Sequence, residues 1–346
     1  MRPFPDPKPD LLGADSDLQQ AFDNAMATTP QAPRNAPIAI VALNDSAPHG
    51  LAGQLLTEVH YSASLLKVAA MYAAFALRKS VNEHLVAARP TADQVYPTLH
   101  NAFDDVIRQQ RVPQLVGLAD GFLLPRWEQV FEVDVERSVV NFSQTFFGNL
   151  FDAIAGLDNE SAANAAAGAV IKQLGFGYLT KAVAAAGFLD PNATSQPRTA
   201  DGMWLCGDFG HGFPPQRILC VNDTPVAQAT SVHQMARLFT FLAGNSPLVD
   251  GDSDEAMVRL LTHAVLRRHL FLNRDTTVQF VTTQSKIGLG PLNNGTRVAS
   301  EAAIIQENTT GSRFVVVFQN QRFVNNASIQ PVSQVVDATI AGFLFT

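Results

Sequence analysis

The chain has 346 residues, of which 47% are hydrophobic and 16% are charged, so it is long and apolar enough to bury a large core in more than one layer. Its formal net charge is −7 and no run of lysines and arginines occurs, which argues against nucleic acid or an anionic membrane as a partner. The longest apolar run, residues 68–77, is too short to span a bilayer.

The first predicted elements are an arm, a helix and a hairpin. Residues 1–17 are rich in proline and aspartate and predict a flexible arm. They contain no apolar stretch of the kind that a signal peptide has, so the protein is either not exported or has lost a leader. The segment "DLQQAFDNAM" predicts a helix with an acidic start. The runs "PIAIVALND" and "AGQLLTEVHYS" predict two strands, joined by the turn "DSAPHG".

The next segment, "YSASLLKVAAMYAAFAL", predicts a helix over residues 64–79 that is apolar on every side except at Lys67. A helix of this kind lies inside a domain. A buried ammonium group is costly, so Lys67 either has a partner or extends its charge to solvent from a partly buried helix.

The middle of the chain predicts helices around one long loop, at about residues 190–230, whose length indicates a function. Its two cysteines, Cys206 and Cys220, either form a disulfide or stay free thiols. We expect no metal site and no cofactor, because no His-Glu-x-x-His spacing and no phosphate-binding glycine pattern occurs. The predicted helices are "TADQVYPTLHNAFDDVIRQQ", "SQTFFGNLFDAIAGL", "SAANAAAGAVIKQLG", "YLTKAVAAAGF", "SVHQMARLFTFLAG" and "DEAMVRLLTHAVLRRHLF".

In the last seventy residues, the pattern of apolar residues changes to one typical of β-strands. "TVQFVTTQSKIG", "RVASEAAIIQEN" and "SRFVVVFQNQ" predict three strands, and "IQPVSQVVDATIAGFLF" predicts a terminal helix. We therefore expect an α/β (α+β) fold. Residues 18–60 and 276–346 form one five-stranded antiparallel sheet flanked by the N- and C-terminal helices, and residues 61–275 form an inserted all-helical domain.

One serine stands three residues before the buried lysine. Ser64 and Lys67 therefore share a helix face. A desolvated lysine loses its proton more easily, and the neutral amine can then accept the serine proton as a general base. The spacing alone is weak evidence, since a serine three residues before a lysine is expected roughly once in a chain of this length.

The order of the elements adds to that evidence. Nearly the whole chain resembles the serine β-lactamase and penicillin-binding protein superfamily. The shared order is a hairpin, a buried helix that opens with Ser-x-x-Lys, a helical insertion, and then a strand with Lys-x-Gly. The likeness is to its class A β-lactamase-like branch. It implies that Ser64 is the nucleophile and Lys67 the general base. It also puts the third motif on Lys286, Ile287 and Gly288, with Lys286 guiding the substrate or relaying a proton.

The second motif of the family, Ser-Asp-Asn, is altered in this chain. A gap-free alignment puts Asp158, Asn159 and Glu160 in its place. Asp158 could relay a proton only if it were held protonated, and an ionised Glu160 cannot donate the hydrogen bond that asparagine gives to a substrate amide. Ile287 lacks the hydroxyl that the family offers to a substrate carboxylate, so a typical penicillin is not the expected substrate.

The resemblance implies further substrate-binding groups. The backbone N–H groups of Ser64 and of Leu289 or Gly290 would form the oxyanion hole. Arg297 either replaces the lost contact to a carboxylate or is a solvated arginine at the end of a strand.

The class A glutamate that activates the deacylating water has no counterpart, because no glutamate occurs between residues 161 and 254. His211 or Asp208 either takes its place or is an ordinary loop residue. We therefore expect acyl transfer or hydrolysis of an amide, ester or lactam through a Ser64 acyl-enzyme, with a small-molecule or peptide-like substrate. The alternative is an inactive or weakly active relative that uses the fold as a binding module. The sequence leaves the compartment and the oligomeric state open.

Overall fold

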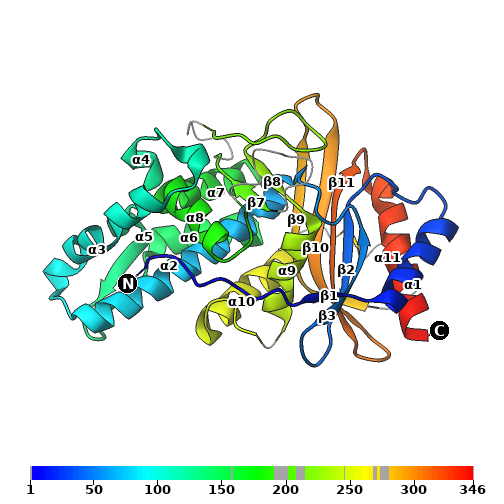
Figure 1. Ribbon diagram of the computed structural model, residues 1–346, viewed down its shortest axis with the longest axis horizontal. Helices are drawn as coiled ribbons and strands as arrows, with labels where there is room; N and C mark the ends of the chain where they lie inside the picture. Colours follow the sequence, from blue (N-terminus) through cyan, green and yellow to red (C-terminus); the bar gives the residue numbers. More distant parts are fainter. Residues whose placement is uncertain are drawn as a thin grey trace.

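The computed structural model describes residues 2–156, 159–190, 202–207, 215–244, 246–267, 271–272 and 280–345. Its centre is a six-stranded sheet in the order β1-β3-β2-β11-β10-β9, which joins both ends of the chain as predicted (Figure 1). Neighbouring strands are antiparallel except β1 and β3, which are parallel. The strands are β1 (Leu12–Ala14), β2 (Ile38–Ala42), β3 (His49–Gln54), β9 (Phe280–Pro291), β10 (Arg297–Glu307) and β11 (Arg313–Arg322).

Helices cover both faces of this sheet. Side chains alternate along a strand, so Val316 and Phe318 face α1 (Ser16–Thr28) and α11 (Gln330–Phe345), whereas Val315 and Val317 face the other side. There α9 (Val232–Ala243) packs on β2, β10 and β11, and α10 (Gly251–Arg267) packs on β9. The sheet therefore separates two hydrophobic cores.

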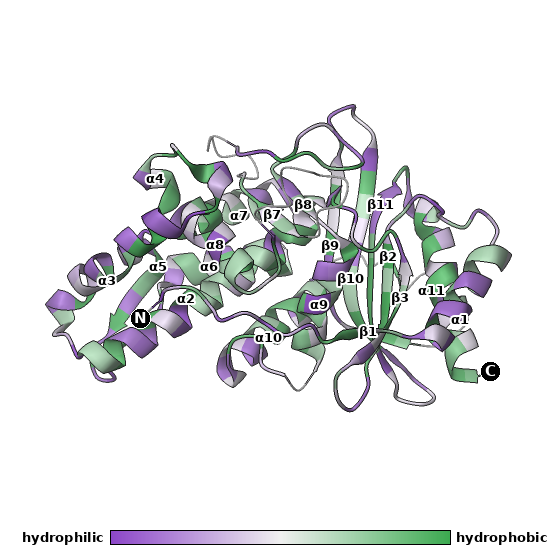
Figure 2. Ribbon diagram, in the orientation of Figure 1, coloured by the Kyte–Doolittle hydropathy of each residue, from purple (hydrophilic) through white to green (hydrophobic). Residues whose placement is uncertain are grey.

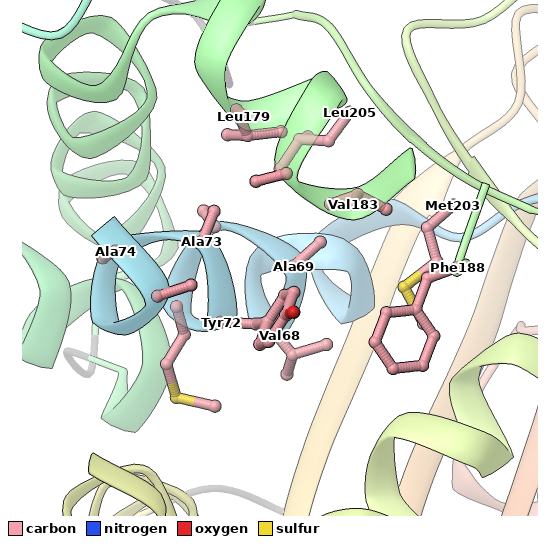
Figure 3. Close-up of a cluster of buried hydrophobic side chains, with 14 of the residues drawn as sticks. Val68, Ala69, Tyr72, Ala73, Ala74, Leu179, Val183, Phe188, Met203 and Leu205 are labelled. Atoms are coloured by element: carbon pink, nitrogen blue, oxygen red, sulfur yellow. The ribbon is translucent and has the colours of Figure 1, made fainter. Parts of the chain in front are cut away.

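The larger core surrounds α2 (Lys67–Ala88), which is buried along most of its length. Figure 3 shows Val68, Ala69 and Tyr72 of α2 against side chains of α8, together with Phe188 and Met203. The sequence predicts this helix because alanine and leucine favour helix and none of its first ten residues after Lys67 is charged. The other long helices of this part are α3 (Val95–Gln110), α6 (Gln144–Ala155), α7 (Glu160–Leu174) and α8 (Phe176–Ala185), and short ones are α4 (Asp120–Leu123) and α5 (Trp127–Val130).

The structure differs from the expected elements in three places. The segment expected as a flexible arm contains β1, a sixth strand in the sheet, and buries Leu11. The run "AGQLLTEVHYS" is divided at Leu55, where φ is +51°, so that its two halves join different sheets. The region expected as all-helical contains a sheet of β4 (His60–Tyr61), β8 (Gln228–Thr230) and β7 (Met203–Leu205) and a hairpin of β5 (Phe131–Asp134) and β6 (Val139–Phe142). These strands have two to four residues, too few for a period to be visible.

Hydropathy follows this arrangement. In Figure 2 the central strands of the sheet are mostly green and several connecting loops are purple. In the described ranges, no helix has the length and apolar character needed to cross a bilayer.

One buried arginine links the N-terminal segment to the helices through hydrogen bonds. Arg237 of α9 is 5% exposed, and its guanidinium donates hydrogen bonds to the carbonyl oxygens of Lys8 (3.0 Å) and Pro9 (3.2 Å). It also donates to the carbonyl of Gly187 and to the Gln234 side chain, both at 2.8 Å. A buried guanidinium with several acceptors holds two distant segments together.

We expect Arg237→Met to lower the free energy of unfolding by about 2–4 kcal/mol, because it leaves several buried acceptors without their charged donor. Chemical denaturation measures this change. The matched control is Arg259→Met, which removes an exposed pair with Glu255 and should change stability by no more than about 0.5 kcal/mol. Equal effects of the two substitutions would contradict the role of Arg237.

Candidate active site

Ser64 lies in a tight turn at the start of α2. The turn is a 3-10 helix, Ala63–Leu66, in which Ser64 is 7% exposed. Ala63 has a φ of +48°, the left-handed region that residues other than glycine seldom adopt. Such a conformation costs free energy and persists only where the surroundings impose it.

Lys67 begins α2 and is 2% exposed. Its Nζ donates to Asn164 Oδ1 at 2.8 Å and to the Ala163 carbonyl at 3.3 Å, both on α7. These acceptors offset part of the cost of burying the amine. A neutral amine can donate its N–H groups to such acceptors and accept a proton on its lone pair.

Strand β9 passes directly against the Ser64 turn. A Cβ atom at Gly288 would lie 2.5 Å from the Ser62 carbonyl oxygen and 2.8 Å from the Leu65 nitrogen. At Gly290 a Cβ would lie 2.7 Å from Tyr61 Oη and 3.3 Å from Ala63 Cβ. Only glycine allows the strand backbone to approach this closely. The strand carrying the predicted third motif therefore packs directly on the turn carrying Ser64.

Solved β-lactamase structures match nearly the whole chain. A class A β-lactamase from Bacteroides cellulosilyticus has a TM-score of 0.50 and 11% identity, covering 94% of this chain and 97% of that one. The protein PBP-A has a TM-score of 0.51 and 13% identity, with 97% of each chain covered. For the extended-spectrum β-lactamase TLA-3 the values are 0.51 and 8%, covering 94% and 96%. The chain has the fold of the serine β-lactamases and penicillin-binding proteins.

No protein-family model matches the sequence, and no curated protein matches it. At identities of 8–13%, these structural matches establish the β-lactamase fold. The chemistry of the site has to be argued from this chain's own side chains.

Within the β-lactamase fold, β9 divides the predicted third motif between the two faces of the sheet. Lys286 is 1% exposed and lies opposite Ala302, which belongs to the core on the α2 side. Ile287 and Leu289 pack instead into the core beneath α11. The side chain of Ile287 therefore points away from Ser64, although its backbone and that of Leu289 run along the site.

Other predicted residues lie at the margin of the site or beyond it. Glu160 is exposed at the first position of α7. Arg297 is exposed at the start of β10, opposite Pro291 and therefore on the sheet face of Leu289 rather than that of Lys286. Three predicted residues lie outside the described residues, namely Asp158, Asp208 and His211. The two cysteines, Cys206 and Cys220, are buried free thiols.

Sequence reasoning missed Asn164 as a site residue. We used it only to mark the start of a helix, whereas its side chain is the acceptor closest to Lys67 among the contacts described above. A signal was available, because Asn164 lies four residues after Glu160 and therefore on the same face of α7.

Tyr61 was also missed. Its hydroxyl lies beside Gly290, and its side chain borders a cavity of about 290 Å³ that Asp223, Asn293 and Arg217 also line. Burial raises the pKa of Tyr61 to about 12, with further contributions from the negative charges of Asp223 and Glu160. Tyr61 therefore keeps its proton at neutral pH and can donate a hydrogen bond. Among the described residues, no group of three or more His, Cys, Asp or Glu side chains could hold a metal ion.

The neighbouring His60 predicts a pH dependence of stability. It is 2% exposed in β4, and its pKa lies below 6.5 because burial outweighs the hydrogen bond to Glu58. The unfolded chain therefore binds more protons just below pH 6.5, so the free energy of unfolding should fall as the pH drops below that value. We expect His60→Gln to make this fall shallower in denaturation curves measured between about pH 7.5 and 5.5. Parallel pH profiles of the two proteins would contradict this assignment.

Proposed function

We propose that the protein performs serine-dependent acyl transfer or hydrolysis on an ester, amide or lactam through an acyl-enzyme on Ser64. One observation carries this proposal: a lysine that is 2% exposed, three residues from a serine, is held by two acceptors on α7. Buried lysines are costly and concentrate at sites that use them.

In the proposed acylation, Ser64 Oγ attacks the substrate carbonyl carbon and its proton passes to Lys67 Nζ. The carbon–leaving group bond then breaks, and the departing group takes a proton derived from Lys67. Water or an amine attacks the resulting ester carbonyl and releases Ser64 with its proton restored. Asn164 acts as a positioning residue, because its Oδ1 accepts a hydrogen bond from the Lys67 amine.

Two further sets of groups would stabilise the transition state in this proposal. The backbone N–H groups of Ser64 and of Leu289 or Gly290 would bind the oxyanion, which is supported by the close approach of β9 to the Ser64 turn. Lys286, on the same strand and the same sheet face as Gly288, would supply positive charge to the substrate. Both roles depend on backbone and charge rather than on the Ile287 side chain.

A second candidate function is binding without turnover. It is favoured by the direction of Ile287, which packs beneath α11 and offers nothing to a substrate, and by the lack of a glutamate between residues 161 and 254. In this case a ligand would occupy the site without forming a covalent bond to Ser64.

Intact-mass measurement separates the two functions. The protein and its Ser64→Ala variant are treated with a fluorescent penicillin and with a panel of activated esters. We expect a mass gain equal to one acyl group in the unmodified protein and none in Ser64→Ala. Reversible binding of these probes with no adduct on either protein would favour the binding module, and equal adducts on both would contradict the assignment of Ser64.

A further inference from the structure

Glu160 stands on the site-facing side of α7. It precedes Asn164 by four residues, so the two side chains lie on one face of the helix, about 6 Å apart along its axis. Asn164 contacts Lys67, and this contact fixes the face of α7 that looks toward the start of α2. Glu160 is exposed, and its carboxylate makes no ion pair within the described part of the chain. It is therefore available to a substrate bound near Ser64.

A second carboxylate lies at the cavity beside Tyr61. Asp223 borders this cavity of about 290 Å³, and its carboxylate accepts hydrogen bonds from the Asn293 nitrogen (2.9 Å) and the Thr224 nitrogen (2.8 Å). Two backbone donors fix its position and leave further lone pairs for a ligand. Because Tyr61 Oη lies over Gly290, the cavity adjoins the strand that packs on the Ser64 turn. Glu160 and Asp223 both act electrostatically on the Tyr61 hydroxyl, which places it in a region of negative potential.

The positively charged side chains near Glu160 and Asp223 differ in how deeply they are buried. Lys67 and Lys286 are buried beside the reacting centre and serve the proposed chemistry there. Arg217 also lines the cavity, and because Arg217 and Glu160 are both exposed, solvent and salt screen both charges. Glu160 can only accept hydrogen bonds, whereas an asparagine at its position would also donate one. The substrate group that fits here is a hydrogen-bond donor with a positive charge.

We propose that Glu160, together with Asp223 and the Tyr61 hydroxyl, recognises a free ammonium group on the acyl part of the substrate, so that the preferred acyl donors are aminoacyl esters or amides. This inference rests on the proposed acylation of Ser64 and adds the class of acyl group to it. Glu160 and Asp223 determine specificity in this scheme and take no part in bond making.

The experiment compares three activated 4-nitrophenyl esters of similar size. The glycyl ester carries an ammonium group, the propanoyl ester is its neutral isostere, and the malonyl ester carries a carboxylate. Acylation rate constants at limiting ester are divided by the rates of spontaneous hydrolysis, and the ratio of glycyl to propanoyl is the readout. We expect Glu160→Gln to lower this ratio about tenfold or more, the effect of losing one charge-assisted hydrogen bond. Added salt should lower the ratio in the unmodified protein as well.

Glu255→Gln is the matched control, because Glu255 is exposed on α10 and pairs with Arg259. It should leave all three rates unchanged. Ser64-dependent adducts with an unchanged ratio in Glu160→Gln, or a preference for the malonyl ester, would overturn ammonium recognition alone. If none of the esters forms a Ser64-dependent adduct, the proposed function is overturned, and the inference with it.

Discussion

Replacing Lys67 by methionine should lower the rate of Ser64 acylation by about 10²–10⁴, the usual contribution of a positioned general base. Methionine has a similar shape and removes a buried amine whose acceptors include Asn164 and Ala163. These buried acceptors then lack their donor, which should lower the free energy of unfolding by about 1–3 kcal/mol. The variant should therefore stay folded but lose nearly all acylation, whereas a purely structural lysine would affect stability alone.

Single-turnover acylation by an activated ester, together with thermal unfolding, measures both quantities. Lys79→Met is the control, because Lys79 is on the same helix but pairs at the surface with Glu83. Its acylation rate should equal that of the unmodified protein. A Lys67→Met variant that acylates within about twofold of the unmodified protein would remove general-base catalysis from the mechanism.

Gly288→Ala is the second substitution with a large expected effect. The added Cβ would lie 2.5 Å from the Ser62 carbonyl oxygen and 2.8 Å from the Leu65 nitrogen, and both are backbone atoms that cannot rotate away. Either β9 or the Ser64 turn has to move. Overpacking of this kind costs about 1–3 kcal/mol of stability. Displacement of a reacting group by about 1 Å can cost about 10² in rate, so we expect acylation to fall at least tenfold.

The control for this substitution is Gly148→Ala. Gly148 lies in α6, where an added Cβ meets no heavy atom within 4 Å. Alanine favours helix over glycine by up to about 1 kcal/mol, so the control should be as stable as the unmodified protein or more so, with unchanged acylation. If Gly288→Ala keeps full activity, the site does not depend on the close approach of β9.

The sequence predicts the fold well where patterns are long. The apolar run of α2 and the long strand-like runs of β9, β10 and β11 predict a buried helix and a sheet built from both chain ends, and the structure confirms both. β1, β4 and β7 have two or three residues, and their existence depends on pairing with distant segments. No local period reveals such strands.

The candidate site is predictable only in part. The contact between Lys67 and Asn164 spans 97 residues and arises from how α7 packs against the start of α2, which the sequence does not display. The orientation of the Ile287 side chain, in contrast, can be derived from the sequence. A strand has a period of two, so Lys286 and Gly288 on one face require Ile287 on the other. The family motif and the strand geometry therefore assign different directions to the Ile287 side chain.

The candidate site is built from segments that lie far apart in the sequence. Ser64 leaves the ribosome more than two hundred residues before β9, whose glycines complete its surroundings. A nascent chain that ends before residue 280 therefore carries the serine and Lys67 without the strand that packs on them. Synthesis proceeds from the N-terminus, so the site is assembled only when the last part of the chain docks. If Ser64 is acylated as proposed, the nascent chain should not be acylated before β9 has been synthesised and has packed on the serine turn.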